Sequence, residues 1–398
     1  MNQIPAVAGG NPVRSQYLVF GSPSIGEEEI SEVTESLRSG WVGTGPKVKR
    51  FEEMFRKFKG SRHAIAVSSC TAALHLSLLT LGIKPGDEVI TTPITFAATA
   101  NAIYHVGARP VFADVQKDTM NIDPVAVGKK IRRETRALIP VHLGGRPCPM
   151  DEVMELAHRF NLRVIEDAAH AIEASYKGRP LGTLGDIGCF SFYVTKNITT
   201  VEGGMVITEQ DDWAQTIKSM ALHGMTADAW SRYSDEGFKH YQVVSAGFKY
   251  NMTDIQASIG IPQFKKMEAY AQRRKEIWEI YQQSFRDLPL LLPSPTPPDQ
   301  RHAYHLYSPL LDLDRVRCTR DQFLHALHKE NIGAGIHYVA LHLHPFYQKT
   351  LGYRVGEFPN AEFISHRTFS LPFSAKLTRH DVDDVVQAVS KILTYYSK

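Results

Sequence analysis

The sequence predicts an α/β protein with two domains, the larger one built on a mostly parallel sheet with helices on both faces. One observation is that short apolar runs alternate with helical patterns from His63 onward, as in AIAVSS, TAALHLSLLTLGI, DEVITTP and FAATANAIYHVGA. Another is the length of 398 residues, which exceeds what one ordinary core requires. A smaller α+β domain is therefore expected at the C-terminal end.

Two helices are expected before the first strand. Ser24 and Glu27 form a capping-box pair, and apolar residues follow at helical spacing, namely Ile30, Val33 and Leu37. After the turn GWVGTGP, Pro46 suits a first helical turn, and an apolar face follows at Val48, Phe51, Phe55 and Phe58. Both segments are therefore predicted to be amphipathic helices.

The alternation continues through PVFADV, a helix near residues 124–133, ALIPVHL, a helix over 151–160 and RVIEDAAH. The apolar run from Cys189 to Val194 indicates a buried strand, and MVITE indicates another. Residues 222–248 show no regular pattern, helical periodicity resumes over 254–285, and the Pro-rich stretch LPSPTPPDQ is a connector. We place the domain change near Tyr250, which gives a large domain over 1–250 and a smaller one over 251–398.

Composition excludes several classes of protein. A hydrophobic content of 43% with 22% charged residues is typical of soluble globular proteins, and a net charge of +3 without basic runs argues against nucleic acid as a partner. The four cysteines form no CxxC pair, so neither a zinc knuckle nor a disulfide framework is expected. The N-terminus does not resemble a signal peptide and no stretch suits a membrane span, so a cytoplasmic protein is expected.

Parallel sheets bind ligands outside the carboxyl ends of their strands, and candidate residues gather at such ends. In VSSCTAALHL a strand is followed by a helix that begins near Thr71, and free N–H groups at that junction suit a phosphate. The alternative is a plain N-cap made by Ser69 or Thr71. In VIEDAAHA, Asp167 ends a strand and His170 follows, so both could face one crevice; the alternative is that Asp167 caps the next helix.

Lys196 follows the aromatic strand and stands among threonines and glycines rather than other charges. Desolvation would lower its pKa and make the amine a nucleophile, although a lysine that extends to solvent from a strand end is the simpler alternative. Gly203 and Gly204 permit close approach of the backbone to a ligand, and they would suit any hairpin equally well.

Together these features fit pyridoxal phosphate. This cofactor requires a lysine for its aldehyde, a carboxylate for its ring nitrogen, an anion site for its phosphate and a flat group on its ring. Phe96, in TPITFAAT at another strand end, could be the flat group, although a core phenylalanine is the alternative.

Six segments carry a resemblance to a known family. They are GWVGTGPKVKRFEE, HAIAVSSCTAALHLSL, GDEVITTPITFAATANAI, VIEDAAHA, GDIGCFSFYVTKNITTVEGGMVIT and GFKYNMTDIQASIG. In this order the sequence resembles the DegT/StrS-type sugar aminotransferases, which are fold-type-I pyridoxal phosphate enzymes, from about Phe20 to the end. The resemblance implies a seven-stranded sheet in the large domain. One departure is Val201, where the family often has glycine.

The resemblance implies a role for each matched residue. Lys196 forms a Schiff base with the cofactor and carries the proton between substrate and cofactor, and pyridoxamine phosphate is the intermediate form. Asp167 pairs with the ring nitrogen, His170 contacts the phenolic oxygen and Phe96 stacks on the ring. The residues that hold the phosphate are Thr71, Ala72, Ser191 and, from a neighbouring subunit, Asn251. A homodimer with shared active sites follows, and His337 and Tyr338 are expected on the substrate side.

The implied reaction moves an amine from L-glutamate, which becomes 2-oxoglutarate, to a keto group of a UDP- or dTDP-linked sugar. The position C4 fits best, in a pathway to cell-surface polysaccharide or lipopolysaccharide, with amination at C3 or of a keto-inositol as alternatives. A deoxygenating branch of the family carries histidine in place of the lysine, so Lys196 argues against it. Two other hypotheses are a non-catalytic sensor of cofactor or nucleotide sugar and a metal site at His337, His342 and His344.

Overall fold

The computed structural model describes residues 4–226 and 241–398. Its central feature is a seven-stranded sheet with the strand order β1-β9-β8-β5-β4-β2-β3. The strands are β1 His63–Val67, β2 Glu88–Thr91, β3 Arg109–Phe112, β4 Thr135–Ile139, β5 Arg163–Asp167, β8 Ile187–Ser191 and β9 Gly204–Thr208. Strand β9 alone runs in the direction opposite to the other six strands of this sheet. The predicted α/β class with a mostly parallel sheet is therefore confirmed.

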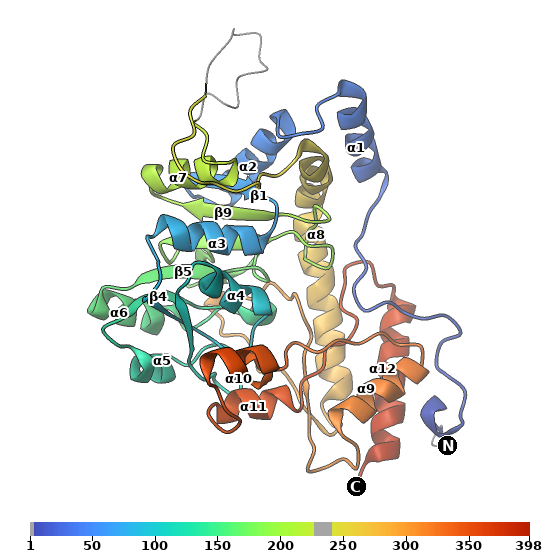
Figure 1. Cartoon of the computed structure of the whole chain (residues 1–398). Helices are drawn as coiled ribbons and strands as arrows, with labels where there is room; N and C mark the ends of the chain where they lie inside the picture. Colours follow the sequence, from blue (N-terminus) through green and yellow to red (C-terminus); the bar gives the residue numbers. More distant parts are fainter. Residues whose placement is uncertain (1–3, 227–240) are drawn as a thin grey trace.

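Helices cover both faces of this sheet (Figure 1). One face packs against α3 Cys70–Thr80, α4 Ala97–His105 and α7 Asp211–Ala221. The other packs against α2 Pro46–Lys59, α5 Pro124–Lys130, α6 Met150–Phe160 and the start of α8 Asp254–Phe285. Alternate side chains of one strand enter the two cores, since Cys189 belongs to the first and Phe190 to the second, as the pleat of a strand requires.

The long helix α8 runs from the sheet into the C-terminal part of the molecule (Figure 1). There it shares a core with α9 Arg320–Lys329, α12 Arg379–Tyr396 and the strand pair β10 Leu290–Leu291 and β12 Leu310–Leu311. Helices α10 Pro345–Leu351 and α11 Pro359–Ser365 pack instead beside the sheet, in a cluster with Ile94 and Phe112. A small sheet joins β6 Ser175–Tyr176, β7 Arg179–Pro180 and β11 Gln300–Arg301.

The first described residues pack on the C-terminal part of the chain. The backbone N–H groups of Ala6 and Val13 each donate to the buried Glu330 carboxylate at 2.8 Å, and Arg14 pairs with Asp384 at 2.6 Å. We keep the domain division near residue 250 as a proposal, with the N-terminal segment placed on the smaller domain. Within the described residues, no helix has the length and apolar character needed to cross a membrane.

Two local predictions were wrong. The helix α1 Glu27–Ser39 is capped at Gly26, whose N–H donates to Glu29 Oε2 at 2.7 Å, so the capping pair is not Ser24 with Glu27. Strand β8 ends at Ser191 rather than Val194. The chain turns after this point, where the N–H of Lys196 donates to the carbonyl of Tyr193, and the Tyr193 side chain is exposed.

Candidate active site

A cavity of about 650 Å³ lies at the carboxyl ends of the parallel strands, within the size range of small-molecule sites. Most of the predicted site residues line it, coming from several elements far apart in the sequence: Thr71, Phe96, Asp167, His170, Ser191, Lys196, His337 and Tyr338. Ala72 and Asn251 lie outside its lining. The topology of the sheet therefore gathers eight of the ten candidates around one space.

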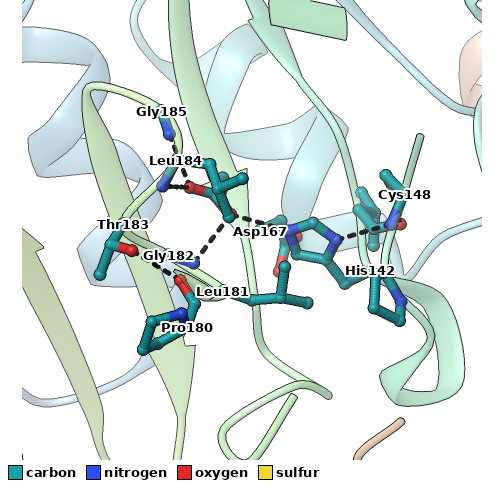
Figure 2. A network of polar contacts seen from close by, with 12 residues as sticks. His142, Cys148, Asp167, Pro180, Leu181, Gly182, Thr183, Leu184 and Gly185 are labelled. Atoms are coloured by element: carbon teal, nitrogen blue, oxygen red, sulfur yellow. Dashed lines mark hydrogen bonds and ion pairs between the residues drawn. The ribbon is translucent and has the colours of Figure 1, made fainter. Parts of the chain in front are cut away.

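The end of β5 holds two adjacent carboxylates on opposite faces. Glu166 accepts hydrogen bonds at 2.7 Å from the backbone N–H groups of Gly182, Leu184 and Gly185. His142 completes this shell, because its Nδ1 accepts from the N–H of Cys148 and its Nε2 must then donate to Glu166 at 3.1 Å. Figure 2 shows His142 between Cys148 and the turn 182–185. This network fixes the strand end that carries Asp167.

Asp167 faces the cavity with fewer protein partners. Thr99 Oγ1 donates to its Oδ2 at 2.8 Å and the N–H of Ala169 donates to its Oδ1 at 3.2 Å. Burial raises the pKa of Asp167, and Thr99, Ala169 and the charge of Lys196 only partly oppose that effect. A buried carboxylate of this kind is stabilised by a cation placed against it.

His170 is fixed as a donor toward the site. Its Nδ1 accepts from the N–H of Gly144 at 3.2 Å, so its proton lies on Nε2, which is 3.4 Å from the hydroxyl of Tyr338. Burial, followed by the charges of Lys196 and His337, lowers the pKa of His170 well below its ordinary value. The ring is therefore neutral and presents one N–H group.

Lys196 lines the same cavity. Desolvation lowers the pKa of its amine to about 8, and Cys70 and Asp167 act in the opposite direction. About a tenth of the amine is then unprotonated at pH 7, far more than for an ordinary lysine, and a Schiff-base lysine requires such free amine.

The N-terminus of α3 forms another wall of the cavity. Ser69 is the N-cap, and its Oγ accepts from the N–H of Ala72 at 3.1 Å, so the plain N-cap considered from the sequence is present. Thr71 lies one residue earlier in the same turn and lines the cavity beside Ser191. An N-cap and an anion site are compatible, because a helix N-terminus has several free N–H groups.

The two glycines after Glu202 serve backbone packing at this wall. A Cβ on Gly204 would lie 2.5 Å from the carbonyl of Ser69, and one on Gly203 would lie 2.1 Å from Thr200 Oγ1. Side chains at either position would therefore displace the start of α3 or the turn after Lys196. The residue that departs from the family pattern, Val201, adopts φ of 70° in this turn.

Aromatic residues surround the mouth of the cavity. Phe96 is the N-cap residue of α4 with 63% of its surface exposed, and its ring centroid lies 6.2 Å from that of Tyr338. Phe20, from the N-terminal segment, stacks on His337 with 5.4 Å between ring centroids. Phe96 is therefore not a core phenylalanine.

Several residues that line this cavity were missed from the sequence, among them Phe20, Thr99 and His305. Thr99 follows Thr95 by one helical turn at a strand end, a pattern that could have marked it. Nothing in the sequence around Phe20 or His305 indicates a site, since Phe20 reaches the cavity from the N-terminal segment and His305 from the C-terminal part, both through packing of segments distant in sequence.

The alternative metal site has no support in the described residues. His342 Nε2 pairs with Glu362 at 3.0 Å and is fully buried, whereas His337 Nδ1 pairs with Ser370 Oγ at 2.8 Å. Over residues 4–226 and 241–398, no three His, Cys, Asp or Glu side chains form a group that could hold a metal ion.

Known proteins resemble this chain over nearly its whole length. It is 52% identical over 382 residues to an uncharacterised protein of Methanocaldococcus jannaschii, covering 96% of this chain and 99% of that one. It is 48% identical over 381 residues to the spore coat polysaccharide biosynthesis protein SpsC of Bacillus subtilis, covering 96% and 98%.

Solved structures give the same result. Spr1654 of Streptococcus pneumoniae, provisionally named a sugar aminotransferase, superposes in its PMP-form with a TM-score of 0.88 at 32% identity, over 95% of this chain and 99% of that one. A PLP-form of the same protein matches equally well in fold. The predicted cofactor is thus confirmed for a relative of the same fold.

The family model for the DegT/DnrJ/EryC1/StrS aminotransferases matches residues 23–390. With the cavity, its lysine and its carboxylate in place, this match establishes that the chain belongs to the DegT/DnrJ/EryC1/StrS aminotransferase family and is an aminotransferase.

Proposed function

We propose that this aminotransferase uses pyridoxal phosphate to transfer an amine from L-glutamate to the C4 keto group of a nucleotide-linked sugar. The observation that carries the proposal is the convergence of Lys196, Asp167 and His170 on one cavity with a helix N-terminus in its wall. The residues fit the cofactor: Asp167 is buried with no ion pair within the described part of the chain, and Lys196 has an amine of lowered pKa.

Each residue has a task that its surroundings support. Asp167 would hold the ring nitrogen, which supplies the cation that its buried carboxylate requires. His170 would donate through Nε2 to the phenolic oxygen, and Phe96 would cover one face of the ring. Thr71, Ser191 and the N-terminus of α3 would hold the phosphate. When bound, the cofactor withdraws electrons from the substrate carbon that carries the amine.

Lys196 would move the proton between that carbon and the cofactor. Its pKa of about 8 suits both directions of transfer, because the amine can accept a proton and release it again near neutral pH. The same lysine argues against the deoxygenating branch of the family.

The sugar substrate is proposed from the relatives and from the shape of the site. SpsC is named for polysaccharide biosynthesis and Spr1654, provisionally, as a sugar aminotransferase. The cavity mouth carries Phe20, His337 and Tyr338, side chains that suit the ring of a sugar and its hydroxyl groups. We place the reaction on a route to cell-surface polysaccharide. All four cysteines are free, as a cytoplasmic location would favour.

We also propose a homodimer in which Asn251 of one subunit completes the site of the other. The side chain of Asn251 lies outside the cavity of its own chain, donates to Thr44 Oγ1 at 2.7 Å and leaves its buried Oδ1 without a partner. Nearby, α1 and the following turn expose Ile30, Leu37, Trp41 and Val42, each by close to half or more. Apolar groups exposed in this way favour contact with a second copy.

Mixing two inactive variants tests the shared site. Lys196→Ala and Asn251→Ala are each expected to be inactive, and random re-pairing of their subunits should restore about a quarter of wild-type activity, since half of the dimers would carry one intact site of two. A mixture that stays inactive, although sedimentation shows exchanged dimers, would contradict the shared site.

The acceptor is tested by two-stage spectroscopy. The protein loaded with pyridoxal phosphate is expected to lose its visible absorption on addition of L-glutamate and to regain it with a 4-keto sugar linked to UDP or dTDP. Sugars with the keto group at C3 and a keto-inositol serve as comparison acceptors. Recovery only with one of these would correct the proposed position, and a band that no amino acid changes would indicate a binding protein instead.

A further inference from the structure

A chain of buried polar side chains extends from Lys196 into the C-terminal part of the molecule. Asn197 Nδ2 donates to Glu173 Oε2 at 2.7 Å and to the carbonyl of Ala303 at 2.8 Å. Glu173 pairs through its other oxygen with Arg274 of α8 at 2.5 Å. At the other end, Asn197 Oδ1 lies 2.9 Å from His305 Nδ1.

The hydrogen-bond partners in this series of side chains fix the tautomer of His305. Glu173 and the Ala303 carbonyl can only accept, so the amide group of Asn197 must face them and its oxygen must face His305. His305 Nδ1 therefore carries the proton and Nε2 is an acceptor. His170 has the opposite arrangement, with its proton on Nε2, and the two rings are tilted by 34° with 4.4 Å between centroids.

His305 Nε2 is left free to accept a hydrogen bond within the described residues, in a cavity that Lys196 also lines. Among the described residues His305 forms its one side-chain hydrogen bond through Nδ1, and its Nε2 is not among the fully covered atoms that lack a partner. His305 and Lys196 together line the main cavity and also a small chamber of about 30 Å³, which Asn197 lines as well. A chamber of that size has room for a water molecule.

We propose that His305 is a positioning residue for Lys196: its Nε2 accepts a hydrogen bond from the lysine ammonium, directly or through one water in the chamber. This inference rests on the proposed function, in which Lys196 holds a proton during transfer. The Asn197–Glu173–Arg274 chain keeps the acceptor in place by preventing the other tautomer. His305 itself stays neutral, since burial and the neighbouring positive groups lower its pKa well below the ordinary value.

Two substitutions of His305 distinguish the role of Nδ1 from that of Nε2. Asparagine places a polar atom near the position of Nδ1 and keeps the contact with Asn197, whereas glutamine places one near Nε2. His302 is a matched control, because it lies three residues away with the same 6% exposure and lines a different cavity, which does not include Lys196. His302→Asn retains an acceptor for the N–H of Tyr304, as His302 Nδ1 does at 2.7 Å.

The first readout is the pKa of Lys196 in the full chain without cofactor. The rate of reductive methylation of Lys196 by formaldehyde and cyanoborohydride, measured by mass spectrometry as a function of pH, gives this pKa. His305→Asn should lower it by about one unit, because an acceptor that stabilises the ammonium is lost, whereas His305→Gln and His302→Asn should stay close to wild type. The three variants retain the other titratable groups that act electrostatically on Lys196 or His305, namely Cys70, Asp167, His170, Arg274 and His337.

The second readout is the rate at which L-glutamate removes the visible absorption of the loaded enzyme. His305→Asn should slow it by about tenfold at saturating glutamate, with the half-saturating concentration within about threefold of wild type. An unchanged Lys196 pKa in His305→Asn, or an equal shift in His302→Asn, would overturn the inference. If wild type does not respond to L-glutamate, the proposed donor fails, and the Lys196 pKa still decides the role of His305.

Discussion

Glu166 and Asp167 are neighbours on one strand and are both buried, yet their surroundings differ. Glu166 receives three backbone N–H groups and His142, and His142 and these N–H groups keep the pKa of Glu166 below its ordinary value although burial alone would raise it. Asp167 receives only Thr99 and one backbone N–H, and its pKa is raised. The first carboxylate is satisfied by the protein, and the second has capacity left for a ligand. The carboxylate whose burial the protein's own hydrogen bonds offset only in part is therefore the candidate functional residue of the two.

The largest effect is expected from Asp167→Asn. Loss of the charge that would stabilise the ring nitrogen should slow the glutamate half-reaction by about a hundred- to a thousandfold. Stopped-flow absorbance of the loaded enzyme measures this rate. A rate within threefold of wild type would show that Asp167 is a structural residue like Glu166.

Glu166→Gln should have the opposite effect, a loss of stability with little change in the rate of the half-reaction. Its amide would place N–H groups against the donors that now bind the carboxylate, so the free energy of unfolding should fall by about 2–4 kcal/mol. Urea unfolding measures the loss, and the glutamate half-reaction per folded molecule should change by less than about threefold. A large loss of rate without a loss of stability would place Glu166 in the chemistry.

The two carboxylates should also respond oppositely to pH in protein without cofactor. The lowered pKa of Glu166 stabilises the fold above the ordinary pKa of 4.5, and this stability is lost as the pH falls through the folded pKa. The raised pKa of Asp167 destabilises the fold as the pH rises above the ordinary pKa of 3.8 and through the folded pKa.

Asp167→Asn should therefore raise the Tm of the cofactor-free protein at pH 7 by a few degrees, since the Thr99 hydroxyl can turn to accept from the new amide. Scanning calorimetry at pH 4 and pH 7 would measure the difference. A Tm gain at pH 4 as large as that at pH 7 would show that the charge of Asp167 is not its cause.

The smallest effect is expected from Thr99→Val, which removes one donor to Asp167 and should slow the half-reaction by about three- to tenfold. Thr91→Val is the matched control, because the buried hydroxyl of Thr91 donates to the Ile139 carbonyl at 2.8 Å and does not touch Asp167. Equal slowing in both variants would attribute the effect to general destabilisation of the sheet.

A feature could be predicted from the sequence where local residue patterns determine it, and could not where the packing of distant segments does. The sheet was predictable because strand and helix periods alternate locally, and Asp167, His170 and Lys196 were recognisable because they stand at strand ends. His305 and Phe20 were not, since their places depend on how distant segments pack. The end of β8 was misplaced because the aromatic pattern continues into the turn, where Tyr193 becomes exposed. The role proposed for Asn251 would require a second chain.

The most direct measurement is the affinity for pyridoxal phosphate, from titration of visible absorption, in wild type, Asp167→Asn and Glu166→Gln. We expect Asp167→Asn to weaken binding by about tenfold or more, because the carboxylate that would hold the ring nitrogen is lost, whereas folded Glu166→Gln should bind like wild type. Equal affinity in wild type and Asp167→Asn would contradict the claim that the bound cofactor completes the surroundings of Asp167.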